Sequence, residues 1–566
     1  MKLVSRGDTT VVDAYLSPIL RQYVNQVATQ LTANGDGVVP SRDDSCGVGI
    51  LPARRDDSCG VGILPARIIQ ETGETPIPQH QTGETPMAPN LTGETPIPQN
   101  DQNPRANMQR HEDDYQLPIT NYQLPKLMFM QSHGGLTDAQ NFQGKDSILS
   151  GPAGGIVGAV QTSLIAGFDK IITFDMGGTS TDVAHYAADV RAGTPTPQFP
   201  QYERTFETEV AGVRLRSPMM AIHTVAAGGG SILYFDGARY RVGTSSAGAN
   251  PGPACYRQGG PLTVTDCNVM VGKLQSEFFP CSFGENGDLP LDAAVVQQKF
   301  AALAREIADG RSPEEVAAGF LAIAVDKMAS AIKKISLQRG YDVSEYTLCC
   351  FGGAGGQHAC LIADALGMKQ VFVHPYAGVL SAYGMGLADV RVMRESAVEA
   401  KLTGDLLPEL EQLLSQLARE AEEELNRHRR AAASRRVDAK DAKEEEEEEK
   451  LVLCKVHLRY EGTDSALVVD FGDVGEMRRR FEEAHRQRYG FVAPEKGLVV
   501  EAVSVEVIGK SDIPEAAIIE RKSNESPVSV ASVRMFTGNT WHETPIFQRS
   551  GLQSGDCILG PAIIVE

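Results

Sequence analysis

IITFDMGGTSTDVAHY, residues 171–186, is the stretch that decides the fold of this protein. Its apolar and β-branched start predicts a buried strand. That strand delivers Asp175 to a tight turn made by Gly177 and Gly178, and hydroxyl residues and a second acid, Asp182, come next. A strand that ends in an acid and two glycines predicts a site in which backbone N–H groups contact a bound ligand.

The chemistry of this turn is that of a phosphate cradle. Glycines let backbone N–H groups approach a phosphate without steric hindrance, and the carboxylate of Asp175 can hold a magnesium-bound water beside it. The alternative is an ordinary β-hairpin turn, because two adjacent glycines often join paired strands. The segment alone leaves both interpretations open.

A second glycine cluster stands in CCFGGAGGQHACLIADALG, residues 349–367, where it again follows a strand and opens a helix. Gly352, Gly353, Gly355 and Gly356 are positioned to pass under a flat base or ribose, or to bring helix N-terminal amides near a phosphate. No Lys follows these glycines and no complete dinucleotide fingerprint surrounds them. Two strand–glycine turns, about 175 residues apart, predict two sides of one cleft.

A third glycine run, Gly228, Gly229 and Gly230, lies between the other two. It predicts either another anion-binding nest or merely close packing of strands, and both remain open. His223 and His358 are candidates to titrate near neutral pH, although a lone histidine among apolar residues is more often a hydrogen-bonded core residue.

The spacing of the cysteines favours neither a metal site nor a disulfide scaffold. Ten are present, without metal-ligand spacing and without the density of a small disulfide scaffold, so reduced and mostly buried thiols are expected. Cys255 has no adjacent base for a nucleophilic role. Cys46 and Cys59 leave a metal-binding or partner-binding loop as an alternative for their segment.

Composition limits the classes of partner. The chain has 566 residues, 42% of them hydrophobic, and a formal net charge of -20. That charge argues against nonspecific attraction to nucleic acid or to anionic membranes, so neither is expected as a partner. No signal peptide or membrane-spanning apolar run is evident, and a cytoplasmic location is expected.

Five segments are expected along the chain. Residues 1–34 form an amphipathic helix, and 35–125 form a disordered insertion of short repeats such as RDDSCGVGILPAR and TGETP. Residues 126–400 alternate strands and helices, as in a helix-covered sheet. Residues 401–450 are a charged helical segment, and 451–566 form a smaller C-terminal α+β domain.

Within the third segment the pattern predicts individual elements. Buried strands are expected at 126–130, 171–176, 346–353 and 370–375, and helices at 314–339 and 356–367. The longer helix keeps a 3.6-residue period and ends in Arg339-Gly340.

Six ordered motifs resemble the hydantoinase A/5-oxoprolinase family, whose ATPase fold is shared by actin, hexokinase and heat-shock chaperones. They are SGPAGGIVGAV, FDMGGTSTDVA, TVAAGGGS, SAGANPGPACYRQGGPLTVTD, FGGAGGQHAC and YAGVLSAYGMGLADV, followed more weakly by HRQRYGF and GPAIIVE. The resemblance implies an α/β fold, namely an actin-like (ribonuclease H-like) ATPase lobe with a mixed, helix-covered sheet. YERTFETEVAGV and FFPCSFGENGDLPLD are more similar to the 5-oxoprolinase branch than to the N-methylhydantoinase or acetone-carboxylase branches.

The resemblance implies ATP-driven hydrolysis of a cyclic amide, 5-oxo-L-proline, to L-glutamate, with ATP and magnesium as cofactors. It places Asp175 as the magnesium or water ligand, Asp182 as a second catalytic carboxylate, and Gly177, Gly178 and Thr179 on the terminal phosphates. Gly228 and Gly229 are further phosphate candidates. The four glycines from 352 to 356 would flank the adenosine.

Departures from the family pattern limit the expected activity. The family's first phosphate turn, Asp-Ile-Gly-Gly-Thr-Phe-Thr-Asp, and its hydantoinase B half do not occur in this sequence, and His133 and Cys267 replace usual residues. The expected activity therefore depends on a hydantoinase B-like chain or domain as partner, and a homodimer is left open. An ATPase subunit of a hydantoinase or carboxylase complex, and a noncatalytic remnant of an interrupted gene, remain alternatives.

Overall fold

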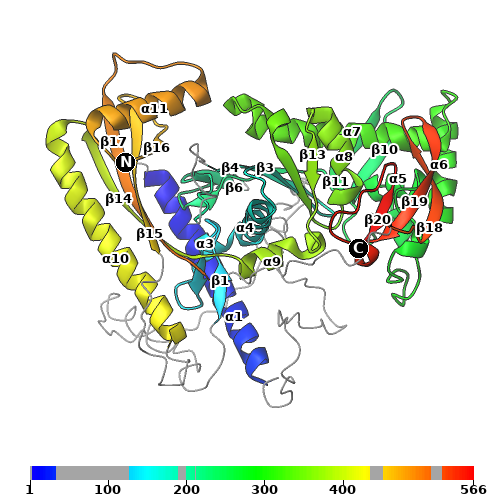
Figure 1. Ribbon diagram of the computed structural model, residues 1–566, viewed down its shortest axis with the longest axis horizontal. Coiled ribbons are helices and arrows are strands. Elements are labelled where there is room, and N and C mark those ends of the chain that lie inside the picture. The colour runs from blue at the N-terminus through cyan, green and yellow to red at the C-terminus, as the bar shows by residue number, and fades with distance from the viewer. Residues whose placement is uncertain (1–2, 34–126, 189–198, 211, 434–449, 512–525) are drawn as a thin grey trace, which may run out of the picture.

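The computed structural model describes residues 3–33, 127–188, 199–210, 212–433, 450–511 and 526–566. The insertion expected at 35–125 and the acidic run at 444–449 lie outside the described residues. Two sheets organise the rest, one of five strands and one of six. Figure 1 shows the six-stranded sheet on the left with α10 and α11, and the five-stranded sheet toward the centre and right.

The five-stranded sheet has the order β13-β12-β3-β4-β9. Its strands are β3 (Lys170–Met176), β4 (Thr181–Ala187), β9 (His223–Val225), β12 (Thr347–Phe351) and β13 (Gln370–Phe372). β3, β12 and β13 are parallel, whereas β4 runs antiparallel to both β3 and β9. All five residues of β12 are buried, as expected for a strand covered on both faces. The predicted mixed, helix-covered sheet is confirmed.

Helices cover both faces of this sheet. One face carries α5 (Val264–Met270), α6 (Ala293–Ile307), α7 (Pro313–Ile335) and α8 (Ala359–Leu366), and the other carries α4 (Ser150–Ile165) and α9 (Leu380–Gly386). Along β3, Ile172 and Phe174 belong to the α7 core, whereas Ile171 belongs to the α4 core. Because side chains alternate along a strand, Asp175 is on the α4 side.

The helix predicted over 314–339 begins where its sequence signals place it. Ser312 accepts a hydrogen bond from the backbone N–H of Glu315 in a capping box, and Pro313 occupies the first turn. The α-helix ends at Ile335, and the residues that follow form a short 3₁₀ turn, η4 (Leu337–Arg339), closed by Gly340 at φ 82°. The predicted end was therefore four residues too late, because the last turn tightens before the glycine.

The six-stranded sheet has the order β1-β2-β14-β17-β15-β16. Its elements are β1 (Met128–Met130), β2 (Leu136–Asp138), β14 (Val390–Lys401), β15 (Lys450–Tyr460), β16 (Leu467–Asp470) and β17 (Leu498–Gly509), with helices α10 (Leu407–Ala433) and α11 (Val474–Tyr489) packed on it. The sheet draws strands from both sides of the predicted boundary at residue 400. Every residue of β17 is buried.

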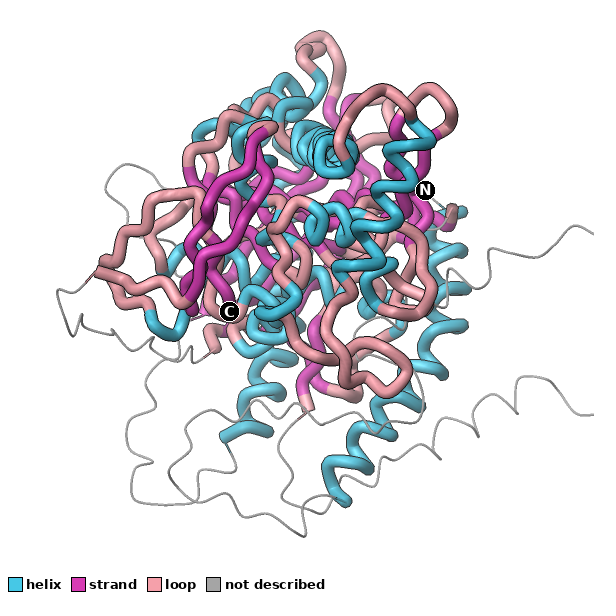
Figure 2. The backbone as a smooth tube through the Cα atoms, turned by 90° about the vertical axis from the view of Figure 1, so that its right-hand side faces the viewer, coloured by secondary structure: helices cyan, strands magenta, loops and turns pink. Residues whose placement is uncertain are grey.

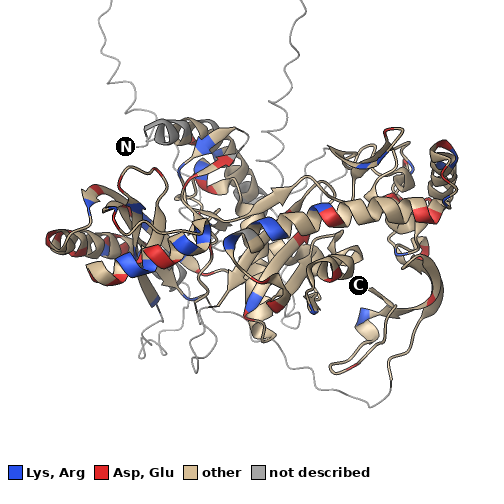
Figure 3. Cartoon of the chain, turned by 90° about the horizontal axis from the view of Figure 1, so that it is seen from above, with Lys and Arg blue, Asp and Glu red and all other residues tan. Residues whose placement is uncertain are grey.

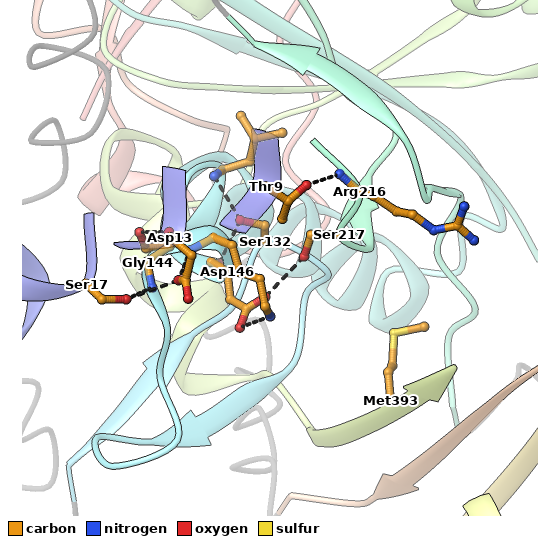
Figure 4. Close-up of polar contacts among 12 residues, drawn as sticks. Thr9, Asp13, Ser17, Ser132, Gly144, Asp146, Arg216, Ser217 and Met393 are labelled. Atoms are coloured by element: carbon orange, nitrogen blue, oxygen red, sulfur yellow. Dashed lines mark hydrogen bonds and ion pairs between the residues drawn. The ribbon is translucent and has the colours of Figure 1, made fainter. Parts of the chain in front are cut away.

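The predicted N-terminal helix is observed as α1 (Leu3–Ala33), and it docks on a distant part of the chain. The Asp13 carboxylate accepts a hydrogen bond from the backbone N–H of Lys145 at 3.0 Å, and the Ser17 hydroxyl accepts one from Gly144 N–H at 3.1 Å. Figure 4 shows these side chains pointing from α1 toward the start of a short helix, α3 (Gly144–Ser147). The contacts satisfy amides that the helix start leaves without intrahelical partners.

The remaining strands form small hairpins and a three-stranded sheet. They are β5 (Arg204–Thr205) with β8 (Met219–Met220), β6 (Thr208–Val210) with β7 (Val213–Leu215), β10 (Ser231–Phe235) with β11 (Tyr240–Ser246), and the sheet of β18 (Ala531–Thr537), β19 (Thr540–Gln548) and β20 (Ile563–Val565). Figure 2 shows β18 and β19 as a long magenta ribbon beside the C-terminus. They attach to the five-stranded body, because Phe536 N–H donates to the Val271 carbonyl at 2.8 Å.

Charged side chains are interspersed along the exposed helices. Figure 3 shows basic and acidic segments alternating along them. In α11, Arg479 and Glu483 form an ion pair at 2.8 Å. None of the described helices combines the length and the apolar composition needed to cross a bilayer.

Candidate functional site

The segment 177–180 is the tip of a β-hairpin. β3 and β4 pair in register up to Met176 and Thr181, and Gly177 N–H donates to the Ser180 carbonyl at 3.1 Å. The hairpin interpretation is therefore the observed backbone geometry. Whether the tip also serves as a phosphate cradle depends on what surrounds it.

Three glycine segments meet at this tip. Gly229 N–H donates to the Gly177 carbonyl at 3.0 Å, and Gly230 N–H donates to the Gly178 carbonyl at 2.6 Å. A Cβ placed on Gly228 would lie 2.7 Å from the Gly178 backbone, too close for any side chain.

The glycine turn after β12 reaches the hairpin from the other side. Ala354 N–H donates to the Met176 carbonyl at 3.0 Å. A Cβ on Gly352 would overlap a carboxylate oxygen of Asp175. The structure therefore brings Asp175, Gly177, Gly178, Gly228, Gly229 and Gly352 together in one site.

The amides of this site fall into two groups. Those of Gly228 and Gly229 are already used, because Gly228 N–H donates to the Ser231 hydroxyl at 3.0 Å and Gly229 N–H to Gly177. This geometry favours the close-packing interpretation of the glycine run. A phosphate contact from Gly228 or Gly229 stays a prediction.

Other amides point into open space. Among the described residues, no acceptor meets the backbone N–H groups of Gly178, Thr179 and Gly353. All three residues are exposed, and a Cβ on Gly178, Gly353 or Gly356 would touch nothing. The Thr179 hydroxyl lies 3.5 Å from the Ser246 hydroxyl. The arrangement offers hydrogen-bond donors to an anion without a rearrangement of the backbone.

Asp175 and Asp182 face each other across the hairpin. They are register partners of β3 and β4, and both line a narrow crevice with Pro152 of α4 and Phe351 of β12. Burial, together with the charge of Asp182, raises the pKa of Asp175 to about 7. Burial also raises the pKa of Asp182, although a hydrogen bond donated by Thr224 at 2.5 Å opposes that shift.

The two carboxylates are candidate ligands for a divalent cation. No ion pair joins either acid to a basic side chain within the described ranges, so their mutual repulsion is uncompensated. The same part of the chain contains no cluster of three or more His, Cys, Asp or Glu side chains that would enclose a metal. Magnesium needs few protein ligands, because it keeps several waters and takes phosphate oxygens as ligands. Asp175 and Asp182 are the residues that would hold it.

Helix α5 connects the glycine segments. Thr265 donates to the Gly229 carbonyl from its N–H at 2.8 Å and from its hydroxyl at 3.0 Å. One turn later, the Asn268 amide donates to the Gln357 side chain at 2.8 Å and to the His358 ring at 3.1 Å. A single short helix therefore holds both the hairpin support and the turn of Gly355 and Gly356.

Two of the three titratable candidates outside the turn are core residues. His358 is fully buried, and burial lowers its pKa to about 3. Burial lowers the pKa of His223 in β9 as well. Cys255 is buried and its pKa is raised, mainly by burial, which disfavours the thiolate a nucleophile needs. The burial of His358 and Cys255 supports the core interpretation of the sequence, whereas His223 is only partly buried.

The structure also adds residues that local patterns did not single out. Thr224 binds Asp182, and Thr265 and Asn268 position the glycine segments. Thr224 stands four residues before the glycine run. Its place in the site follows from its pairing with Asp182 between β9 and β4. Register between distant strands is not readable from a local pattern.

Comparison with known families decides the identity of this arrangement. The hydantoinase/oxoprolinase family profile matches residues 106–394, and the hydantoinase/oxoprolinase C-terminal domain profile matches residues 420–566. The chain belongs to the hydantoinase/oxoprolinase family. The glycine turns and both carboxylates lie within the first match.

Individual relatives agree with this assignment. The chain is 38% identical over 456 residues to 5-oxoprolinase 1 of Arabidopsis thaliana, an alignment that covers 78% of this chain and 34% of that protein. The chain thus spans about a third of the length of such curated relatives.

Solved structures confirm the fold. The ATP-dependent caprolactamase from Pseudomonas jessenii has a TM-score of 0.64 at 26% identity, over 82% of this chain and 64% of that one. Nucleotide-free acetone carboxylase has a TM-score of 0.56 at 22% identity, over 78% of this chain and 61% of that one. The predicted actin-like ATPase fold is therefore confirmed.

Proposed function

We propose that this chain forms one wall of the ATP site of a cyclic-amide hydrolase that opens 5-oxo-L-proline to L-glutamate. The observation that carries the proposal is the hairpin tip, where the amides of Gly178 and Thr179, which meet no acceptor among the described residues, stand beside the carboxylate pair. Family membership and the similarity to 5-oxoprolinases support the reaction class. The cofactors of the proposed function are ATP and magnesium.

Each group at the site has a role in this proposal. Gly178, Thr179 and Gly353 donate their amides to phosphate oxygens, and Gly177 permits the tight turn that exposes them. Asp175 and Asp182 bind the cation and orient water. Bound magnesium-ATP supplies the phosphoryl group that makes the inert lactam carbon electrophilic toward water. Gly355 and Gly356 would flank the adenosine.

Turnover is proposed to require a partner. The chain spans about a third of the length of the 5-oxoprolinases that it resembles, and a phosphoryl transfer site needs donors around the transferred group. We propose that a hydantoinase B-like chain or domain, together with a second phosphate-binding wall, completes the site. The cytoplasm is the proposed location.

Calorimetry with magnesium-ATP tests the site. Asp175→Asn should weaken binding at least about tenfold, because it removes a charged cation ligand. The matched control is Asp169→Asn, the same change at an exposed acid just before β3, at the opposite end of that strand. Equal affinity of both variants for magnesium-ATP would refute the assignment of Asp175.

A second assay tests the substrate. ATP hydrolysis is measured with the partner chain present and with 5-oxo-L-proline, N-methylhydantoin or acetone added in turn. Stimulation by 5-oxo-L-proline alone supports the proposal. Stimulation only by another compound would assign the chain to a different branch of the family.

A further inference from the structure

A cavity of about 510 Å³ lies apart from the glycine turns. It is bordered by the loop that follows η2 (Ala254–Tyr256), by the segment 284–289 and by the first turns of α6. Its volume falls in the range of small-molecule sites. Part of its wall is FFPCSFGENGDLPLD, one of two segments that resemble the 5-oxoprolinase branch, and the proposed ATP site does not use it.

The floor of this cavity is held in place before any ligand arrives. The fully buried carboxylate of Asp266 accepts hydrogen bonds from the N–H groups of Ala254 at 3.0 Å and Cys255 at 2.8 Å. On the rim, Phe283 and Leu289 form a backbone bridge with two hydrogen bonds of 3.0 Å. A preformed cavity loses little conformational entropy on binding.

The charges of the lining divide into a compensated pair and three uncompensated groups. Arg257 is paired with Asp292 at 3.1 Å. The Lys299 ammonium is half-buried and donates at 2.6 Å to the Gly260 carbonyl, which leaves its charge unneutralised. Within the described residues, the exposed carboxylates of Glu285 and Asp288 have no hydrogen-bond or ion-pair partner.

We propose that this cavity binds an amino acid with a basic side chain. The ligand's carboxylate meets Lys299, and its two cationic groups meet Glu285 and Asp288. The cavity presents one uncompensated positive charge and two negative charges, so a complementary ligand carries one negative and two positive charges. L-Lysine, with one carboxylate and two ammonium groups, has this set. The site is independent of the nucleotide site proposed at the hairpin.

Titration calorimetry of the full chain with L-lysine, succinate and cadaverine tests the class of ligand. L-Lysine should bind at least about tenfold more tightly than succinate, which lacks the cations, or cadaverine, which lacks the carboxylate. Absence of L-lysine binding, or equal binding of either analogue, overturns the proposal.

Variants test the location. Lys299→Gln, which removes the charge and keeps a hydrogen-bond donor, and the double variant Glu285→Gln with Asp288→Asn should each weaken L-lysine binding at least about tenfold. The exposed neighbour variant Gln298→Ala and the hairpin variant Asp175→Asn should leave it unchanged. Full affinity in both cavity variants, or a loss of affinity in Asp175→Asn, would place the ligand elsewhere and overturn the proposal.

Discussion

Gly352 has a backbone conformation and a neighbour that both exclude a side chain. Its φ is 81°, and a Cβ there would overlap the Asp175 carboxylate and the Met176 backbone. Gly352→Ala should therefore lower the free energy of unfolding by about 1 to 3 kcal/mol, as measured by urea denaturation. Gly353→Ala is the control, since a Cβ there meets nothing. Equal losses in the two variants would contradict this account.

Buried neutral histidines make stability depend on pH. Burial lowers the pKa of His133 and of His358 to about 3, whereas an unfolded histidine has a pKa of about 6.5. Below about pH 6.5 the unfolded chain gains protons that the folded chain does not, so stability falls as the pH is lowered toward 3. Above that value these residues add no pH dependence.

Removal of one such histidine should weaken the pH dependence of the free energy of unfolding below about pH 6.5. Between pH 7 and pH 5, His358→Gln should reduce the loss of unfolding free energy by up to about 2 kcal/mol relative to the unmodified chain. Urea denaturation at several pH values measures how the free energy of unfolding changes with pH in the variant and in the unmodified chain. The variant's stability at pH 7 is compared separately, because the substitution also alters a hydrogen bond from Asn268. Identical slopes would show that His358 titrates normally.

At the scale of elements, α4 and α9 approach each other through glycines. A Cβ on Gly384 of α9 would overlap the Gly154 carbonyl and the Gly158 backbone of α4. Gly384→Ala should force the helices apart and cost about 1 to 3 kcal/mol or more in thermal or urea unfolding. Gly386→Ala, in the same helix with nothing near its Cβ, should change stability by less than about 0.5 kcal/mol. A tolerated Gly384→Ala would mean that this packing is adaptable.

At the scale of the whole molecule, a buried ion network ties the six-stranded sheet to the β5–β8 hairpin. Glu506 of β17 contacts Arg204, from the segment between β4 and β9, at 2.7 Å, and Arg391 of β14 at 3.1 Å. All three side chains are at most 8% exposed. The two arginines hold the pKa of Glu506 well below its usual range, although burial alone would raise it.

Loss of the Glu506 charge should be costly, because two buried guanidinium groups would remain without it. Glu506→Gln is expected to lower the free energy of unfolding by about 3 to 5 kcal/mol in urea denaturation. Glu345→Gln breaks a 2.6 Å ion pair with Lys170 that is exposed on both sides, and it should cost less than about 1 kcal/mol. A comparable loss in both variants would mean that burial of the network is unimportant.

Local sequence patterns predicted much of the five-stranded body. The apolar runs of β3 and β12 and the capped start of α7 are determined by neighbouring residues, so their positions were readable. The strand partners in the six-stranded sheet were not readable from the sequence, because β1 and β2 join β14, and β14 joins β17, across long stretches of chain. A pattern reports which face of a strand is apolar, and it does not report the strand's partner.

For the candidate site, the sequence by itself determined the order strand, acid, glycine turn, and with it the resemblance to an ATPase family. Only the tertiary structure decided which glycines hold the turn and which expose their amides. Gly229 and Gly230 donate to the hairpin, whereas among the described residues no acceptor meets the N–H groups of Gly178 and Thr179. It also decided that Asp175 and Asp182 share one crevice. Hydrogen bonds and desolvation depend on segments brought together by folding, so no single segment carries that information.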